Sequence, residues 1–193
     1  MTDALCLRPF RSFVLVHMTT SLVITAIGPD RPGIVNELSQ VAQRFGANWE
    51  QSRMASLAGQ FAGMAHFVVD DSKSDALAAA FRALEGSGLT IVIARGAPTT
   101  APSRARRLRL DLVGHDRPGI VRELSGGLAR LGVSIDELHT LVTGAAMSGE
   151  PLFKVKALLA VPEAVTTSAL RTSLESLADE MMVDLEPAQS LGA

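Results

Sequence analysis

An eleven-residue phrase that could bind an anion occurs twice in the chain. It reads GPDRPGIVNEL at residues 28–38 and GHDRPGIVREL at residues 114–124, with two positions changed. In both copies Asp-Arg-Pro-Gly stands directly before apolar residues at helical spacing, which predicts the start of a helix. The first backbone N–H groups of a helix have no intrahelical acceptor and carry partial positive charge, and both properties attract a carboxylate.

The proline and glycine of the phrase are predicted to be the first two residues of each helix. Pro32 suits the first position because its φ is fixed at a helical value and its missing N–H would have had no partner. Gly33 and Gly119 follow, and without a Cβ they let a ligand approach the backbone closely. The alternative stays open that Asp30 and Asp116 are residues near the helix cap and that the glycines only pack.

Other polar residues offer weaker candidate sites. His66 lies in an apolar strand and is interpreted as a packed residue, whereas His115 replaces Pro29 in the phrase and is the better binding candidate. His139 has no carboxylate or cysteine at metal-ligand spacing, so we expect no metal site. The basic run SRARRLR at residues 103–109 is interpreted as a solvated connection.

Composition indicates a folded protein of the reducing cytoplasm. Of the 193 residues, 47% are apolar and 20% are charged, and the formal net charge is −2. This charge gives no general attraction to nucleic acid or to an anionic membrane. The single cysteine, Cys6, excludes an internal disulfide. No apolar run reaches the roughly 18 residues of a membrane span.

The first 17 residues contain two arginines and a short FVLV run. No small-residue cleavage site follows them, which disfavours a signal peptide. We interpret residues 1–19 as an N-terminal extension and Met18 as an alternative start.

The first phrase lies in a pattern of strand, helix, two strands, helix and strand. The expected elements are a strand at residues 21–27, a helix from the phrase to Gly46, a hairpin around Ala58 and Gly59, a helix at residues 74–88 and a strand at residues 89–95. The apolar faces of the two helices are expected to hold Ile34, Val35, Leu38, Val41, Ala42 and Phe45, and Leu77, Ala80, Phe81 and Leu84.

The second copy repeats this order, and its first residue, Gly114, lies 86 residues after Gly28, which indicates a duplicated unit. The expected elements are a strand at residues 107–114, a helix from the phrase to Gly132, strands at residues 133–142 and 152–160, a helix from about Pro162 and a strand at residues 180–186. The first of these helices is expected to bury Ile120, Val121, Leu124, Leu128 and Leu131.

Two βαββαβ units predict an α+β protein with two ferredoxin-like domains in tandem. Each would be an antiparallel four-stranded sheet with both helices on one face. The predicted domains span residues 20–96 and 106–187. A linker rich in Gly, Pro, Ser and Thr joins them at residues 97–105, and a tail follows at residues 188–193.

Charged residues alternate with apolar ones only in the strands of the second copy. They are Arg109, Asp111, Lys154, Lys156, Asp184 and Glu186. The strands of the first copy carry apolar residues at both odd and even positions, and therefore on both faces of the sheet. We expect both faces of that sheet to be covered. The outer face, which includes Val23 and Ile27, would pack against the second copy or against a second chain.

The DRPGIV segments, together with NWEQSRMASLAGQFAGMAHF at residues 48–67, resemble the ACT domain family, small regulatory modules that bind amino acids. From Thr20 to Glu186, the two units resemble the glycine cleavage system transcriptional repressor group. The resemblance implies a ligand between ACT domains, at the loop from first strand to first helix and at the start of the second strand. The residues implied are Asp30, Arg31, Pro32, Gly33, Ile34, Asn48, Asp116, Arg117, Pro118, Gly119, Ile120 and Ser134.

The resemblance implies a cytoplasmic, non-enzymatic homodimer without a cofactor. A small amino acid, glycine in the first place, would bind and alter contact with a transcription factor. The alternative is a detached regulatory subunit that controls an enzyme of amino-acid metabolism. Walker, GxSxG and GxGxxG patterns are absent from the sequence, which disfavours catalysis. No adjacent helix pair offers a helix-turn-helix, so direct DNA binding is not expected.

Overall fold

The structure, a computed structural model, describes residues 18–96, 105–144, 150–176 and 181–188. The chain divides into two compact units, Met1–Thr100 and Ala101–Ala193, which we call the N-terminal and C-terminal domains. The predicted extension before Met18, most of the predicted linker and the tail after Ala188 lie outside the described residues.

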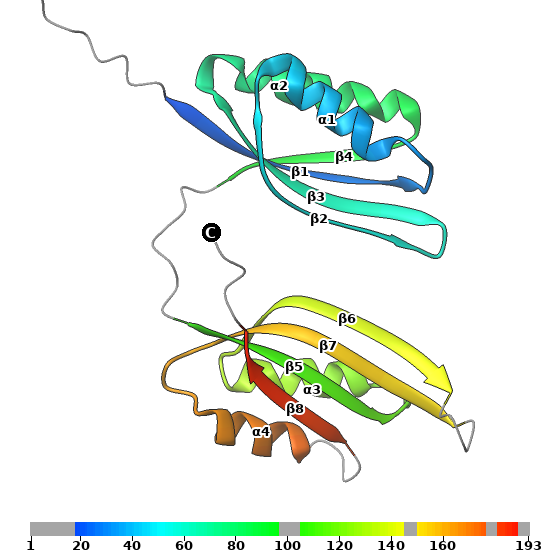
Figure 1. Ribbon diagram of the computed structural model, residues 1–193, viewed down its shortest axis with the longest axis vertical. Coiled ribbons are helices and arrows are strands. Elements are labelled where there is room, and N and C mark those ends of the chain that lie inside the picture. The colour runs from blue at the N-terminus through cyan, green and yellow to red at the C-terminus, as the bar shows by residue number, and fades with distance from the viewer. Residues whose placement is uncertain (1–17, 97–104, 145–149, 177–180, 189–193) are drawn as a thin grey trace, which may run out of the picture. The chain divides into compact units, whose positions relative to one another are not determined.

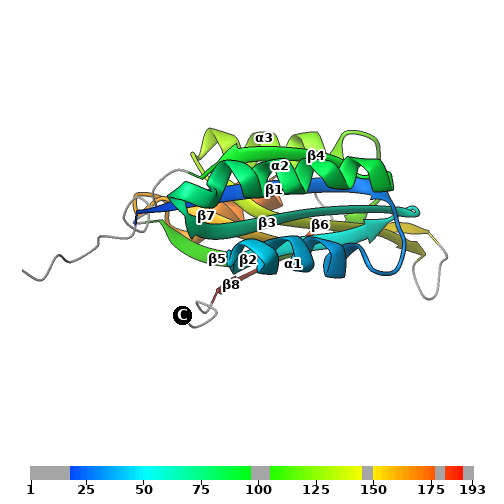
Figure 2. The ribbon, with the colours of Figure 1, turned by 90° about the horizontal axis from the view of Figure 1, so that it is seen from above.

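The N-terminal domain holds six main elements. They are β1 (Thr19–Pro29), α1 (Ile34–Phe45), β2 (Asn48–Leu57), β3 (Gln60–Asp70), α2 (Ser74–Arg82) and β4 (Thr90–Arg95), with 3-10 turns at Asp71–Lys73 and Ala83–Ser87. The strands form one antiparallel sheet in the order β2-β3-β1-β4. Both helices lie on one face of this sheet (Figure 1). Figure 2 shows α1 and α2 extending along the direction of the strands.

The C-terminal domain repeats the arrangement. Its elements are β5 (Arg106–His115), α3 (Ile120–Arg130), β6 (Ser134–Gly144), β7 (Pro151–Val161), α4 (Thr167–Glu175) and β8 (Met182–Pro187). Its antiparallel sheet has the order β6-β7-β5-β8. The prediction of an α+β protein with two ferredoxin-like βαββαβ domains in tandem is therefore confirmed.

Each domain has its own apolar core between the sheet and the helices. In the N-terminal domain Phe67 of β3 is fully buried, and its ring centroid lies 5.0 Å from that of Phe81 on α2. Trp49 of β2 packs edge-on against Phe67 at 4.9 Å. In the C-terminal domain Leu110 of β5 and Leu128 of α3 belong to a separate cluster. Each fully buried side chain of this size contributes roughly 1.5–3 kcal/mol of transfer free energy.

Local turn signals position the elements as the sequence predicts. Ala58 and Gly59 join β2 to β3 with φ of 50° and 76°, the two positive values that a tight hairpin turn requires. Gly46 ends α1 with φ of 65°, a left-handed conformation that glycine adopts without strain. The hairpin and this helix end are both confirmed.

Three helix predictions need correction. Val35 and Val121 are 48% and 42% exposed rather than on the apolar face, because each is turned by 100° from the buried isoleucine before it. The helix expected at residues 74–88 is α-helical only to Arg82 and continues as a 3-10 turn.

The second helix of the C-terminal domain begins later than expected. It starts at Thr167, five residues after Pro162. The hydroxyl of Thr166 accepts a hydrogen bond of 3.1 Å from the Ala169 amide and caps the helix. The segment from Pro162 is instead a turn, in which the Val165 amide donates to the Pro162 carbonyl at 3.0 Å.

The sheet faces that point away from the helices differ between the domains. On the C-terminal domain this outer face is charged as predicted, with Lys156 Nζ 3.5 Å from Asp111 Oδ1. On the N-terminal domain Ile27 and Met64 are 46% and 51% exposed. That a partner covers this face stays a prediction. Within the described parts of the chain, no helix is both long and apolar enough to cross a membrane.

Candidate functional site

The Asp-Arg-Pro-Gly phrase forms the turn between the first strand and the first helix of each domain. Gly33 has φ of 99° and ψ of −10°, a left-handed conformation, and is the N-cap of α1, which begins at Ile34. Gly119 repeats this with φ of 92° and ψ of −7° before Ile120. The prediction that Pro32 and Gly33 are the first two helical residues is therefore wrong. A glycine is required here because a Cβ is strained at such a positive φ.

The space beside Gly33 is open. A Cβ at Gly33 would meet no atom within 4 Å, and one at Gly119 would meet only Glu123 Oε1, at 3.9 Å. Neither N-cap glycine provides a side chain to bond the helix amides. The first intrahelical bond joins the Glu37 amide to the Gly33 carbonyl at 2.9 Å. The amides before Glu37 therefore have no intrahelical acceptor and suit an anion.

Arg31 of the phrase is paired with Glu37 on the first turn of α1. Its guanidinium donates two hydrogen bonds to the carboxylate, of 2.5 and 2.8 Å. These bonds lower the pKa of Glu37 and raise the pKa of Arg31 from their ordinary values. Arg117 and Glu123 make the same pair at 2.9 and 2.5 Å, with the same directions of pKa change.

The sequence pattern did not predict this pair, because Glu37 lies on the polar face of the helix. A signal was present, since the same glutamate occurs at the same place in both copies of the phrase. Both side chains are half-exposed, at 34% for Arg31 and 31% for Glu37. The arginine is thus held by the protein itself, at the edge of the turn.

Asp30 ties the phrase to the β2–β3 hairpin. Its amide donates to the Gly59 carbonyl at 2.9 Å, and its Oδ2 accepts a bond of 2.6 Å from the Ser56 hydroxyl. In the C-terminal domain the Asp116 amide donates to the Pro151 carbonyl at 3.0 Å. Asp30 precedes the N-cap residue Gly33 by three residues. Its hydrogen bonds therefore stabilise the loop and do not cap the helix.

Ile34 and Ile120 are core residues. They are only 2% and 4% exposed and pack in the two apolar clusters. In the phrase they can offer a ligand only their backbone. Pro32 and Pro118 are exposed beside the glycines.

Asn48 lies at the opposite end of the sheet from the phrase. It pairs with Val68, which pairs in turn with Ser21 near the start of β1, whereas the phrase follows the end of β1. The side-chain nitrogen Nδ2 of Asn48 donates a hydrogen bond to Glu50 Oε1 at 2.5 Å. Ser134 lies at the corresponding end of the other sheet. It pairs with Ala160, which pairs in turn with Arg107 near the start of β5. Neither domain by itself brings all its predicted site residues together.

The histidines form no metal site in the described residues. No group of three or more His, Cys, Asp or Glu side chains there could hold an ion. His115 Nδ1 lies 3.9 Å from Glu150 Oε2 on the surface. His66 shares a hydrogen bond of 2.6 Å with the Ser21 hydroxyl, on the sheet face away from the helices.

Comparison with known proteins agrees with this architecture. A family model of the ACT domain matches residues 20–93 and 107–187. Over 40 residues the chain is 52% identical to the glycine cleavage system transcriptional repressors of Escherichia coli K12 and Shigella flexneri. These matches cover 21% of this chain and 21% of each relative, so they span about a fifth of the relatives' length.

Two solved structures resemble both domains. The crystal structure of an unknown protein from Galdieria sulphuraria has a TM-score of 0.78 and 30% identity, over 89% of this chain and 100% of that one. That of a protein provisionally assigned as a glycine cleavage system transcriptional repressor has a TM-score of 0.66 and 19% identity, over 89% and 99%. Since the family model covers both domains, the chain belongs to the ACT domain family and is a tandem ACT domain protein.

Proposed function

We propose that this chain is a non-enzymatic regulator that senses a small amino acid, glycine in the first place, and acts on a transcription factor by protein–protein contact. The observation that carries the proposal is the left-handed turn at Gly33 and Gly119, which leaves open space beside helix amides without an intrahelical acceptor. These amides would bind the carboxylate of the amino acid.

The remaining predicted residues would complete the site from a neighbouring ACT domain. Asn48 and Ser134 lie far from the phrase of their own domain, so they would contact the ligand only where two ACT domains meet. The neighbouring domain would be the other ACT domain of the chain or one of a second copy in a homodimer, and ligand binding would alter how the ACT domains pack. The repressor relatives, identical at 52% over 40 residues, support a transcription factor as the regulated protein.

A thermal-shift screen with the twenty amino acids tests ligand binding directly. A ligand present at a hundredfold excess over Kd raises the free energy of unfolding by about 2.7 kcal/mol. We expect glycine to give the largest rise in melting temperature. No rise with any of the twenty would contradict the proposal.

Calorimetric titration of Gly33→Ala then locates the site, with Gly46→Ala as the matched control. Both glycines have positive φ, 99° and 65°, and open space for a Cβ, so both variants carry backbone strain. Gly46 lies at the far end of α1 from the phrase. We expect Gly33→Ala to weaken glycine binding and Gly46→Ala to leave it unchanged. Equal affinities of the two variants for glycine would show that the phrase is not part of the binding site.

The regulated partner can be identified by affinity purification with and without glycine. We expect recovery of a DNA-binding transcription factor in an amino-acid-dependent amount. Recovery of a metabolic enzyme would favour the alternative, a detached regulatory subunit. The chain alone should give no sequence-specific footprint on duplex DNA, because its sequence offers no helix-turn-helix pair and its net charge of −2 gives no general attraction to phosphate.

A further inference from the structure

The helix α3 of the C-terminal domain has a hollow of about 410 Å³ on its surface. The described residues that line it are Arg122, Glu123, Gly126 and Arg130, all from this one helix. Residues four positions apart lie on the same side of a helix, so Arg122, Gly126 and Arg130 follow one another along it. The two arginines are about 12 Å apart along the helix axis. The hollow is therefore a gap between two arginine side chains, with a glycine beneath it.

The two arginines carry positive charge that the domain does not use. Both are exposed, and in the part of the chain that the structure describes neither the Arg122 nor the Arg130 guanidinium has a hydrogen-bond or ion-pair partner. Glu123 also lines the hollow, but its carboxylate is bonded by Arg117 at 2.9 and 2.5 Å. The hollow therefore presents two positive charges to a molecule from outside.

The glycine of the hollow is not required by the described fold. Gly126 lies inside α3 (Ile120–Arg130) and its φ is not positive, whereas glycine is among the least favourable residues in a helix interior. Among the described atoms, a Cβ at Gly126 would meet only Arg130 Nη1, at 3.9 Å. The next residue, Gly127, is buried, so packing accounts for that one. Gly126 instead leaves the backbone of α3 open to close approach by another molecule.

The corresponding helix of the N-terminal domain lacks this arrangement. The residues of α1 at the three matching positions are Asn36, Gln40 and Arg44. Gln40 places a long side chain where α3 has a glycine, and Asn36 replaces one of the two arginines. The gap with two positive charges therefore belongs to α3 and not to α1.

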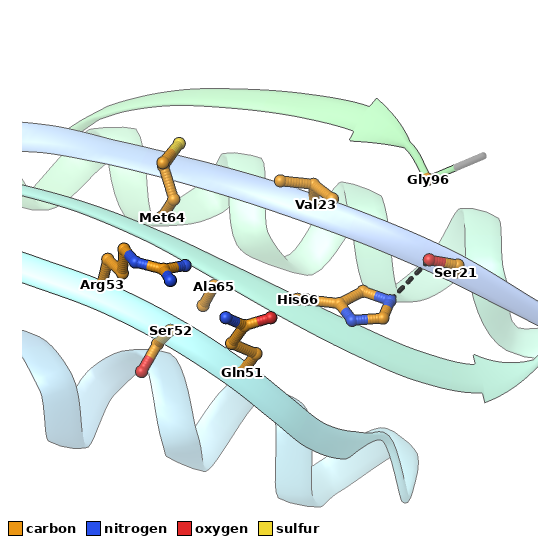
Figure 3. A pocket seen from close by; sticks show the side chains of 9 residues that line it. All are labelled: Ser21, Val23, Gln51, Ser52, Arg53, Met64, Ala65, His66 and Gly96. Atoms are coloured by element: carbon orange, nitrogen blue, oxygen red, sulfur yellow. Dashed lines mark hydrogen bonds between the residues drawn. The ribbon is translucent and has the colours of Figure 1, made fainter. Parts of the chain in front are cut away.

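A second hollow, on the outer sheet face of the N-terminal domain, is a weaker candidate for an external group. Ser21, Arg53 and His66 are among its lining residues, and the Ser21 hydroxyl bonds His66 (Figure 3). Arg53 already has an interaction partner, and we expect the face itself to be covered. The hollow on α3 lies on the helical side of its own sheet (Figure 1) and has arginines that no described residue pairs.

We propose that the hollow over Gly126 is a docking surface for an acidic α-helix of a partner protein. Arg122 and Arg130 pair with two carboxylates of that helix, which can present them on one face at the same spacing. Gly126 lets the partner helix come close to α3. Small-molecule sites are concave and mostly apolar, whereas this hollow is lined by charged residues of one helix, and arginine is enriched in protein interfaces. The inference rests on the proposed function for the existence of a partner and names the surface that contacts it.

The probe is a helical peptide of about 20 residues, long enough to form a helix in water. It is built from alanine and glutamine and carries two glutamates at the spacing of Arg122 and Arg130. Anisotropy of a neutral fluorescent label gives the affinity, and the amide NMR signal of Gly126, identified by its loss in Gly126→Ala, locates the peptide. We expect saturable binding that shifts this signal, weakens at about 1 M salt, where the Debye length is about 3 Å, and is absent when both glutamates are glutamines.

Three variants test the residues of the surface. Arg122→Gln and Arg130→Gln should each weaken binding by up to about fivefold, the ratio expected for a strong exposed ion pair. Gly126→Gln introduces the residue of α1, and should weaken binding while the melting temperature stays equal or rises, because glutamine is the better helix former. The matched control Arg44→Gln removes the corresponding exposed arginine of α1 and should leave the affinity unchanged. Melts followed by circular dichroism verify that each variant is folded.

Three results would overturn the proposal. Unchanged affinity in the double variant Arg122→Gln/Arg130→Gln would show that the arginines do not bind the peptide. Unchanged affinity in Gly126→Gln, together with a lower melting temperature, would show that the glycine serves the fold. Inorganic phosphate that binds as tightly as the peptide and displaces it would make the hollow a site for a small anion rather than for a helix.

Failure of this surface and failure of the proposed function give different results. Glycine could raise the melting temperature while the peptide does not bind, which would reject the docking surface alone. The peptide could bind while none of the twenty amino acids raises the melting temperature, which would reject amino-acid sensing and support the docking surface.

Discussion

Arg31 and Glu37, six positions apart in the sequence, are joined by two hydrogen bonds that span the left-handed turn at Gly33. Arg117 and Glu123 repeat the relationship across Gly119. In each domain the glutamate of the first helical turn is thereby engaged by arginine. Its carboxylate is thus directed to the arginine rather than to the helix amides.

Glu37→Gln should destabilise the N-terminal domain slightly, because a glutamine offers Arg31 one acceptor oxygen instead of two and carries no negative charge. The pair is half-exposed, so the loss should be smaller than that of the core variant Leu38→Ala, which removes buried methyl groups at a cost of about 2–5 kcal/mol. Denaturant melts followed by Trp49 fluorescence measure both. Glu85→Gln, an exposed glutamate of the same domain, is the control. A loss for Glu37→Gln no larger than for this control would mean that the pair does not stabilise the fold.

Stability should fall in acid through the same glutamates. The pKa of Glu37 and the pKa of Glu123 are lowered in the folded protein by hydrogen bonds from Arg31 and Arg117. Their contribution is therefore complete above the ordinary glutamate pKa of about 4.3 and is lost as the pH falls below it. The difference in unfolding midpoint between wild type and the double variant Glu37→Gln/Glu123→Gln should shrink below that pH. A difference independent of pH would contradict the assigned charge pair.

Gly33→Ala should cost about 1–3 kcal/mol of folding free energy, the usual cost of a non-glycine residue in a sparsely populated backbone conformation. Gly86→Ala is the matched control, because a Cβ there also meets no atom within 4 Å but φ is not positive. We expect no loss for Gly86→Ala in Trp49-monitored melts. Comparable losses in the two variants would show that φ is not the cause.

The two domains should respond separately to core mutations. Phe81→Ala removes a fully buried ring that packs on Phe67 and should destabilise the N-terminal domain by about 3–5 kcal/mol. Leu128→Ala creates a cavity in the other cluster. Trp49 lies against the N-terminal core, so its fluorescence should report the first change and not the second. A shift of the Trp49 midpoint in Leu128→Ala would show that the two cores are energetically coupled.

The order of strands and helices could be predicted from the sequence because its signals are local. The apolar run at residues 21–27, the turn at Ala58 and Gly59, and the end of α1 at Gly46 each depend on a few neighbouring residues. The duplicated phrase indicated two equal units, because each copy is itself a short, continuous stretch of sequence. Even the late start of α4 had a local signal, since Thr166 is a preferred capping residue.

Tertiary structure decided the details of the candidate site. The left-handed φ of Gly33 follows from where β1 ends and where α1 must pack, and the pairing of Arg31 with Glu37 follows from that turn. Strand register, a long-range property, placed Asn48 at the opposite end of the sheet from the phrase. It also brought Ser21, Arg53 and His66 around one hollow. Spacing along the chain reports neighbours within one strand or helix, whereas contacts between strands depend on how the whole domain packs.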